Sequence, residues 1–544
     1  MKKISKLLAL LLALVMIISV LAACSSSDDK DTGTKNDTQT DTNTPSDSGS
    51  KDDGGDSAPA DGEKDYTLKI GMMQANNTHD PWADGQTNRT QMQTVFERLL
   101  NQNAETGELE PWLAESYEYI DDSTLRVKLR DNVYFTDGQK LTANDVLLSY
   151  RDYWAAGRMS SYFEAYDWDA TEIVDDLTID FKFSMEFGPA VTMMGAWGIF
   201  CAEDMFGDTA ASADKWMTAP NGTGPYYCVE NVASAYAVYE RKSADQYWGE
   251  LPECTKVTYQ YYSESSTMYI DFESGAIDAA CAIGVMDAQR VLDGDCPAYT
   301  GYYLNPINDV MMFILPDEVE LFNDPRVRQA MMMAVDRENC ALAQYGPLYM
   351  PADSIIPSTV NYYEPQEYPA YDPEGAKALL AEAGYPDGIT LNYIVTMDQQ
   401  DLQEAIQASM AAAGITLNCE SYDPGTAIPM FRDGKTDILT KQAEGGAYIN
   451  EPALLLDTLG PTSTLPPAGM VAPEWADAFE EALYNTDSAK RAEGYAKLQE
   501  WAANEYRILP ICERANMTVY NTDKLASFIL ACADEPCAQY AKFN

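Results

Sequence analysis

Histidine is almost absent from this sequence, and its scarcity excludes several chemistries. His79 is the only histidine among 544 residues, so a zinc or iron site built from several histidines is excluded. A Ser-His-Asp triad would have to use His79, and the chain contains neither a GxSxG nor an HExxH segment. Carboxylates number 86, so acidic pairs arise by chance and do not indicate a glycosidase. The sequence therefore predicts no enzyme activity, no cofactor and no metal site.

Basic side chains are also scarce. Lysine and arginine together number 36 against 86 aspartates and glutamates, which gives a formal net charge of −50. Such an excess of negative charge repels nucleic-acid phosphates and anionic lipid surfaces. It fits a well-solvated secreted protein and argues against nucleic-acid binding, but it does not identify a ligand.

The sequence contains no CxxC pair. After Cys24, cysteines stand at positions 201, 228, 254, 281, 296, 340, 419, 512, 532 and 537. An even number permits disulfides outside the cell, but spacing alone does not assign pairs. Disulfides and free buried thiols are both compatible with the sequence.

Residues 1–23 predict an export signal. Lys2, Lys3 and Lys6 precede an apolar run from Leu7 to Ala23, the charged-then-apolar order of a signal peptide. The small residues directly before Cys24 are similar to a lipobox, in which the cysteine is lipidated and becomes the first mature residue. A plain signal peptide and an uncleaved anchor are the alternatives. A lipidated Cys24 would hold the protein on the outer, extracytoplasmic face of the cell membrane.

Residues 24–65 predict a disordered tether, because Ser, Thr, Asp, Gly, Lys and Asn dominate and almost no apolar residue is present. The chain from Tyr66 to Asn544 exceeds the roughly 250–300 residues at which one hydrophobic core usually stops growing. At least two lobes are therefore expected after the tether.

The segment from Gln91 to Tyr150 has a clear local pattern. Apolar residues at three-and-four spacing predict a helix over 92–100. Alternation predicts a strand over 124–130 with Leu125, Val127 and Leu129 on one face, followed by a short strand at 133–135. A capping box at Thr142 and Asp145 predicts the start of another helix.

Later segments predict an alternating α/β order. Tyr66 to Met73 alternates as a strand, and Tyr226 to Val229 follows a turn rich in glycine. Asp324-Pro325 and Asp372-Pro373 each have the pattern of an N-cap with proline at the first helical position. A strand at 389–395, a helix at 402–413 and a strand at 414–417 predict a β-α-β unit.

The order of several motifs resembles the extracytoplasmic solute-binding proteins of ABC importers, specifically family 5, the peptide/nickel type. The resemblance covers nearly all of the chain after residue 66. The motifs are Val95 to Leu100, Thr106 to Tyr117, Lys128 to Gly138, Leu141 to Val146, Asn221 to Tyr226, Asp245 to Gly249, Phe272 to Asp278, Asn323 to Ala330, Ala334 to Arg337 and Tyr371 to Pro386.

The resemblance implies an α/β, periplasmic-binding-protein-like two-lobe clamp of class II type, with a hinge and an extra subdomain. On the family pattern, lobe I comprises residues 66–111, 219–303 and 508–544, the extra subdomain 112–218, and lobe II 304–507. A clamp of this kind closes on its ligand by hinge bending. It then presents the ligand to the permease subunits in the membrane.

The resemblance also indicates where a ligand would bind. In this family, the segment that follows the first strand lies at the mouth of the ligand cleft. Peptide binders hold the ligand's α-ammonium with an Asp four residues before a proline, here Pro452, but this chain has Tyr448 at that position. Glu444 or Glu451 is the candidate replacement. The predicted ligand-binding residues are Asn76, Asn77, His79, Trp82, Thr396, Met397, Asp398, Glu444, Tyr448 and Asn450.

These observations predict a monomeric, lipid-anchored binding protein that captures short peptides for an ABC permease. The missing Asp keeps oligosaccharides and other small solutes open as alternative ligands, because the 35 Tyr and 9 Trp residues offer stacking surfaces. A non-transport role as a surface sensor is a further alternative. The nickel-type branch is disfavoured, because the chain has so little histidine.

Overall fold

The structure is a computed structural model of the chain. It describes residues 65–73, 78–79, 94–103, 108–156, 163–206, 213–444, 451–456, 459, 472–528, 530–531, 535–536 and 538–544. These residues belong to one compact unit, Lys64–Asn544. No helix among them is long and apolar enough to span a membrane.

Lobe I is built on one end of a large mixed sheet. Within the described residues this sheet has nine strands, in the order β16-β12-β17-β11-β1-β10-β9-β8, with β13 paired to β17. Four of these strands are β12 (Thr300–Ile314), β13 (Tyr349–Pro351), β16 (Leu439–Glu444) and β17 (Ile508–Asn521). The predicted first strand is confirmed, because Leu68, Ile70 and Met72 are buried along it. The lobe I elements are β1 (Thr67–Met72), β8 (Tyr226–Val232), β9 (Tyr236–Arg241), β10 (Lys256–Tyr261), α7 (Ser265–Glu273), β11 (Ala279–Ala280) and α8 (Val285–Leu292).

The C-terminal segment after β17 adds short strands to lobe I. β18 (Leu525–Ser527) pairs with β21 (Lys542–Phe543), and β19 (Leu530–Ala531) pairs with β20 (Glu535–Pro536). Leu525 and Phe528 are buried in the same core cluster as Leu68 and Ile70 of β1. The segment after β17 therefore packs against the part of the sheet that contains β1.

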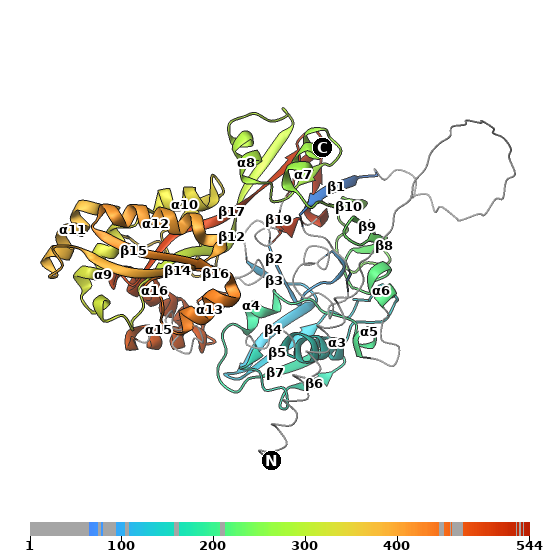
Figure 1. Cartoon of the computed structure of the whole chain (residues 1–544). Helices are drawn as coiled ribbons and strands as arrows, with labels where there is room; N and C mark the ends of the chain where they lie inside the picture. The colour runs from blue at the N-terminus through green and yellow to red at the C-terminus, as the bar shows by residue number, and fades with distance from the viewer. Residues whose placement is uncertain are drawn as a thin grey trace, which may run out of the picture. The chain divides into compact units, whose positions relative to one another are not determined.

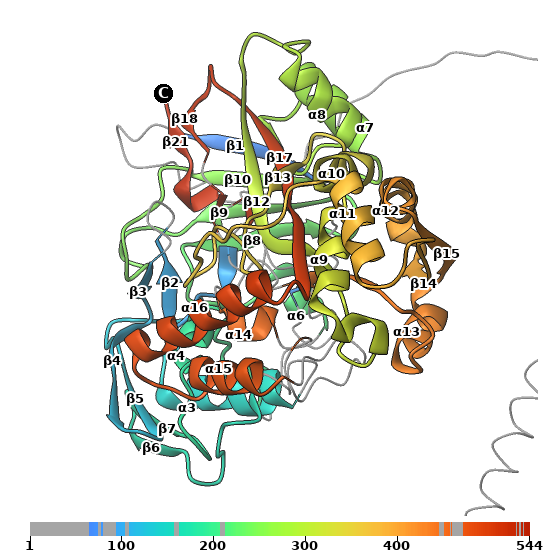
Figure 2. The ribbon, with the colours of Figure 1, turned by 90° about the vertical axis from the view of Figure 1, so that its left-hand side faces the viewer.

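Lobe II follows β12 and contains the predicted β-α-β unit. β14 (Ile389–Thr396) and β15 (Ile415–Tyr422) pair in parallel, and α12 (Gln400–Ala412) connects them. Figure 2 shows α10, α11 and α12 gathered next to these two strands. The remaining helices are α9 (Pro325–Met333), α10 (Arg337–Tyr345), α11 (Pro373–Glu382), α13 (Pro424–Arg432), α14 (Pro452–Leu455), α15 (Pro473–Leu483) and α16 (Ser488–Asn504).

Two predicted helix starts in lobe II are confirmed. The Asp324 side chain accepts a hydrogen bond from the backbone N–H of Arg326, and Asp372 accepts one from that of Gly375. In both helices proline occupies the first turn, where its missing N–H costs no hydrogen bond.

The extra subdomain has a separate sheet, in the order β4-β5-β7-β6. The predicted strand over 124–130 is confirmed as β5, with Leu125, Val127 and Leu129 fully buried. The predicted capping box at Thr142 is confirmed as well. The elements are β4 (Ala114–Asp121), β5 (Thr124–Leu129), α3 (Ala143–Leu148), a π-helical turn (Ser149–Ala155), β6 (Glu172–Asp175), β7 (Thr178–Lys182), α4 (Ala190–Met194), α5 (Ala202–Phe206) and α6 (Ala213–Thr218).

The predicted helix over 92–100 is wrong in its described part. Only Thr94 and Val95 are helical, and Leu100 begins strand β2 (Leu100–Gln102), which pairs with β3 (Leu109–Pro111). The apolar spacing has another cause, because Val95 and Phe96 are buried in the core of lobe I and Leu99 and Leu100 in the core of the subdomain. The segment thus connects two cores, whereas the apolar face of a single helix would pack against one core.

The short strand predicted at 133–135 is also wrong. It is reduced to an isolated bridge between Tyr134 and Lys140. Phe135 N–H donates to the Gln139 carbonyl, and Gly138 has a φ of 86°, so the segment closes on itself as a tight turn.

The cysteines within the described residues are free thiols. Those at 201, 228, 254, 281, 340 and 512 are buried, and those at 296 and 419 are partly buried. Burial raises the pKa of the Cys340 and Cys512 thiols to about 12, which holds them protonated and unreactive at neutral pH. Cys532 and Cys537 lie outside the described residues.

Candidate ligand site at the strands shared by the lobes

Two long strands are shared by the lobes. β12 (Thr300–Ile314) and β17 (Ile508–Asn521) pair from Thr300↔Asn521 to Ile314↔Ile508, and both are visible in Figure 1. Since the chain enters lobe II through β12 and leaves it through β17, these strands form the connection between the lobes. Their pairing is interrupted between Pro306 and Val310. Asn308 in this gap has a φ of 53°, which side chains other than glycine rarely adopt.

An acidic side chain is buried at the interruption. Asp309 is only 3% exposed, and its Oδ2 lies 2.9 Å from Arg514 Nη2 of β17 and 2.7 Å from Gln442 Nε2 of β16 (Leu439–Glu444). A buried carboxylate requires such partners. The Arg514 side chain is 40% exposed, so its guanidinium combines a buried ion pair with access to solvent.

A second buried carboxylate lies next to this pair in the sequence. Glu513 accepts hydrogen bonds from the backbone N–H of Ser358 at 2.7 Å and from the Ser358 hydroxyl at 2.8 Å. Burial raises the pKa of Glu513, while the two bonds from Ser358 lower it. Charged groups of both signs are therefore concentrated where β12, β16 and β17 meet.

Two of the predicted ligand segments converge on these strands. Glu444 is the last residue of β16 and stands opposite Asp309 in the register. The turn at Thr396 to Asp398 ends β14, and the next residue, Gln399, accepts a hydrogen bond from Thr440 of β16 at 2.8 Å. The structure therefore places the turn at Thr396 to Asp398 next to β16, the strand whose last residue is Glu444.

The hydroxyl of Tyr345 lies within electrostatic reach of both groups of residues. Burial is the main cause that raises the pKa of the Tyr345 hydroxyl, and Cys512, Asp309, Arg514 and Asp398 all act on it electrostatically. The side chain of Met397 is 62% exposed, and Gln344 donates to the Asp398 carbonyl at 2.7 Å. The hydrogen bond from Gln344 thus fixes the backbone of the turn, while the side chains of Met397 and Asp398 are exposed to solvent.

His79 has a different environment. Its ring is fully buried in lobe I, where Nδ1 lies 3.0 Å from the Trp216 carbonyl oxygen and Nε2 lies 2.6 Å from the Tyr239 hydroxyl. Burial lowers the pKa of His79 from 6.5 to about 4, against the opposing effect of the Trp216 carbonyl. The ring is therefore neutral at pH 7, with Nδ1 as donor and Nε2 as acceptor.

This burial makes the folded state sensitive to acid. Because the folded pKa lies below the unfolded value of 6.5, the contribution of His79 is complete above pH 6.5 and is lost as the pH falls towards 4. Between pH 7 and pH 5 we expect the unfolding free energy to fall by about 2 kcal/mol more in the wild type than in His79→Gln. Urea titrations at both pH values measure this difference. Parallel pH profiles for the two proteins would contradict a buried, neutral ring.

Several predicted residues lie outside the described residues. They are Asn76, Asn77, Trp82, Tyr448, Asn450 and the predicted lipidation site Cys24. Of the predicted site, the structure therefore places His79, Thr396, Met397, Asp398 and the backbone of Glu444.

Glu451, the alternative to Glu444, is fully buried in a network of its own. Its Oε1 accepts hydrogen bonds from Arg491 Nη2 and from the Tyr495 hydroxyl, each at 2.5 Å, and its Oε2 accepts one from the Thr192 hydroxyl at 3.1 Å. Arg491 also donates to the Gly188 carbonyl at 3.3 Å. Glu451 is therefore committed to a structural ion pair.

This network joins the subdomain to lobe II. Thr192 and Gly188 come from the subdomain, whereas Glu451 and Arg491 come from lobe II. Gly188 N–H additionally donates to the Leu483 carbonyl at 3.2 Å. Glu451, which follows the predicted ligand loop, is thus fixed to the subdomain as well as to the rest of lobe II.

Sequence reasoning missed Asp309, Arg514 and Gln442. A signal existed for the first of these, because Asn308-Asp309 directly precedes the apolar run from Val310 to Ile314. A charged residue at the start of a buried strand needs a partner, but the partner itself follows only from strand pairing. Within the residues that the structure describes, no group of three or more His, Cys, Asp or Glu side chains could hold a metal ion.

Comparison with known proteins identifies the family. The family model for bacterial extracellular solute-binding proteins, family 5, matches residues 108–464. The heme-binding protein A of Haemophilus influenzae is 26% identical over 467 residues, which cover 79% of this chain and 83% of that protein. The periplasmic oligopeptide-binding protein OppA of Salmonella typhimurium is 24% identical over 447 residues, covering 77% of this chain and 81% of OppA.

A solved structure confirms the two-lobe clamp fold. The structure of HbpA2 from Haemophilus parasuis superposes with a TM-score of 0.78 at 21% identity and covers 88% of this chain and 100% of that one. The family consists of binding proteins and not of enzymes. From the family match over most of its length, we conclude that this chain belongs to family 5 of the bacterial extracellular solute-binding proteins of ABC transporters.

Proposed function

We propose that the protein captures short peptides between its lobes and delivers them to the permease of an ABC importer. The observation that carries this proposal is that the candidate site has an accessible charge of each sign, Arg514 on β17 and Asp398 on the turn after β14. Arg514, with a side chain 40% exposed, is suited to a ligand carboxylate, because its guanidinium offers five donors in a fixed geometry. The exposed Asp398 is suited to a ligand ammonium. A peptide with free ends carries both groups.

The sheet edge provides a second reason. β16 is the terminal strand of the large sheet, and its last residue, Glu444, lies opposite Asp309. An extended peptide can add to such an edge through main-chain hydrogen bonds. This mode of binding recognises the peptide backbone and tolerates many side chains.

The proposed site is completed by the loops predicted from the sequence. We include Asn76, Asn77 and Trp82, with His79 as the buried anchor of their segment, and Thr396, Met397, Glu444, Tyr448 and Asn450. OppA of Salmonella typhimurium is named as an oligopeptide-binding protein, which supports a peptide ligand. We further propose that the mature protein is a monomer, that Cys24 carries a lipid anchor, and that residues 24–65 form a tether to the cell membrane.

A thermal-shift screen of residues 64–544, the compact unit, tests the ligand class. We expect mixed tri- to hexapeptides to stabilise the protein, by about 2.7 kcal/mol when a ligand is at one hundred times its dissociation constant. Acetylating the peptide N-terminus should reduce the shift, because it removes the ammonium. Stabilisation by oligosaccharides alone would overturn the peptide assignment.

Asp398→Asn tests whether Asp398 binds the ammonium group of a peptide ligand. Because Asp398 is exposed, the substitution should leave the fold intact and weaken the binding of free-amine peptides by about tenfold, the equivalent of roughly 1.4 kcal/mol. Acetylated peptides should bind both proteins equally. Asp387→Asn, at another exposed position of lobe II, is the matched control. Isothermal titration calorimetry measures the affinities, and equal losses for both peptide types would contradict a role in binding the ammonium.

A further inference from the structure

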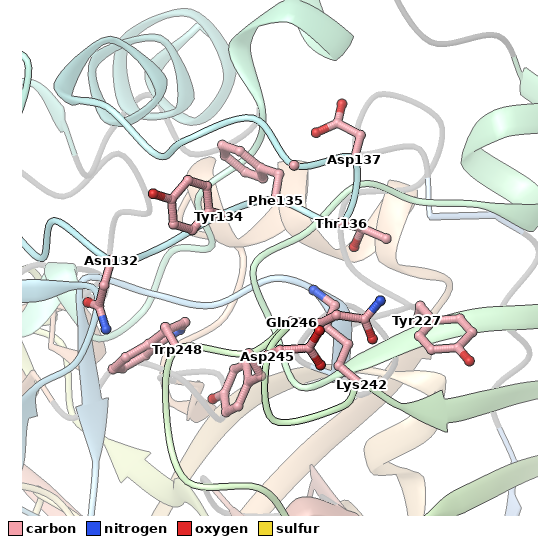
Figure 3. Close-up of a pocket in the computed structure, with 12 residues that line it drawn as sticks. Asn132, Tyr134, Phe135, Thr136, Asp137, Tyr227, Lys242, Asp245, Gln246 and Trp248 are labelled. Carbon is pink, nitrogen blue, oxygen red and sulfur yellow. The ribbon is translucent and has the colours of Figure 1, made fainter. Parts of the chain in front are cut away.

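A cavity of about 510 Å³ lies outside the proposed peptide site. Its lining comes from two segments, Asn132 to Gly138 of the subdomain and Lys242 to Trp248 of lobe I, together with Tyr227. Figure 3 shows these two segments facing one another. None of the lobe II residues that the structure describes lines the cavity. The volume of the cavity falls within the range of small-molecule sites.

The inner wall of the cavity is held rigid by a buried carboxylate. Glu97, 6% exposed, accepts hydrogen bonds from the Tyr247 hydroxyl at 2.8 Å and from Trp248 Nε1 at 2.9 Å. It also accepts one from Trp112 Nε1 at 2.8 Å. The polar ends of Tyr247 and Trp248 are thereby used inside the protein, so these two residues offer the cavity a fixed aromatic surface.

The two segments are also tied together behind the cavity. Thr136 Oγ1 and Lys242 Nζ both donate to the Gly222 carbonyl at 3.0 Å. Asp137 N–H donates to Asn221 Oδ1 at 3.1 Å, and Asn221 Nδ2 donates to Asp137 Oδ2 at 2.9 Å. The cavity is therefore present before any ligand binds, and a ligand would lose little free energy in organising it.

The polar groups at the cavity include the side-chain amides of Asn132 and Gln246 and the carboxylates of Asp137 and Asp245. Ser243 Oγ lies 2.6 Å from Asp245 Oδ1 and 2.8 Å from Gln246 Oε1, and its single proton can serve either acceptor. The Ser243 backbone N–H also donates to Gln246 Oε1 at 3.1 Å, so both side chains are oriented. Asn132 and the hydroxyl of Tyr134, a residue 47% exposed, complete this set. The exposed Asp137 and Asp245 disfavour an anion, and the buried ammonium of Lys242 disfavours a cation.

We propose that this cavity is a second binding site, which takes a neutral saccharide. Sugar rings combine an apolar face, which stacks on an aromatic side chain, with hydroxyl groups that both donate and accept hydrogen bonds. Tyr134 and Trp248 provide the rings, and Asn132, Asp245 and Gln246 provide the donors and acceptors. Because no described residue of lobe II lines the site, we expect that a saccharide bound there is not enclosed by lobe closure. It is a surface contact with a glycan and not transported cargo.

Saturation-transfer NMR on the full chain in detergent tests the proposal with glucose, galactose, N-acetylglucosamine, maltose and cellobiose as probes. We expect transfer to the ring protons of at least one probe and an affinity at least about fivefold lower in Tyr134→Ala, which loses a stacking surface. Tyr385→Ala, at a lobe II tyrosine of similar exposure, 37%, should bind the sugar as the wild type does.

Two outcomes would overturn the proposal. The first is the absence of transfer from all the sugar probes. The second is sugar binding that Tyr134→Ala and Gln246→Ala leave unchanged, since the sugar would then be bound elsewhere. Peptide-induced thermal shifts should be the same in Tyr134→Ala and the wild type, so failure of this proposal can be told apart from failure of the peptide assignment.

Discussion

Replacing Glu451 by alanine should lower the free energy of unfolding by about 3–5 kcal/mol, the cost typical of removing one partner from a buried ion pair. Glu451 is 0% exposed, and Arg491 is 5% exposed. Without the carboxylate, the Arg491 guanidinium would keep only neutral partners, among them the Gly188 and Ala482 carbonyl oxygens. Urea denaturation followed by circular dichroism measures the change.

An exposed ion pair gives the matched control. Lys497 and Glu481 form a pair with side-chain exposures of 54% and 31%, and Glu481→Ala should cost less than about 1 kcal/mol. The double variant Glu451→Met with Arg491→Met should be more stable than Glu451→Ala, because it leaves no buried charge without a partner. Equal losses for Glu451→Ala and Glu481→Ala would contradict the buried network.

Replacing Gly222 by alanine should also destabilise the protein, by about 3 kcal/mol, at the upper end of the usual cost of overpacking a core. A Cβ at this position would lie 2.1 Å from the Val95 carbonyl oxygen, and a backbone atom cannot move aside as a side chain can. The carbonyl of Gly222 also holds Thr136 and Lys242. A shift of this turn would therefore disturb the hydrogen bonds by which Thr136 of the subdomain and Lys242 of lobe I are held to Gly222.

Gly198→Ala is the control for Gly222→Ala. At Gly198 the nearest atom to an added Cβ is Phe96 Cβ at 3.6 Å, an ordinary van der Waals contact, so we expect little change in stability. Thermal unfolding of the two variants side by side measures the contrast. A Gly222→Ala protein as stable as Gly198→Ala would show that the turn at 221–226 does not lie against Val95 as the structure has it.

Local signals in the sequence were reliable at the helix caps and at strand β5, but not at 133–135, where the predicted strand is a tight turn. Asp324 and Asp372 cap their helices, because the capping hydrogen bond joins residues two or three positions apart. Strand β5 was predictable because its alternation matches the pleat of one sheet with one buried face. The helix expected over 92–100 failed because its apolar residues are divided between the cores of lobe I and the subdomain.

The candidate site likewise combines residues that were predicted from the sequence with contacts that were not. The turn at Thr396 to Asp398 and Glu444 were candidate ligand residues on the sequence alone, because a family resemblance transfers positions along the chain. The ion pair of Asp309 with Arg514 was not predicted, because these residues meet only through the antiparallel pairing of β12 and β17. The contacts of Glu451 with Arg491 and Thr192 could not be predicted from the sequence either, because these partners come from different parts of the chain.

The sequence by itself indicated the family, through the order of motifs that resemble it, and determined the helix starts at Thr142, Asp324 and Asp372 and the strand β5. The caps and the strand were predictable because they depend on neighbours within a few residues. Only the tertiary structure decided which charges face solvent and which are neutralised inside. The sequence does not distinguish Glu451, buried against Arg491, from the exposed Asp398. The physical reason is that burial and partner distance set the free energy of a charge, and both arise from contacts between distant segments.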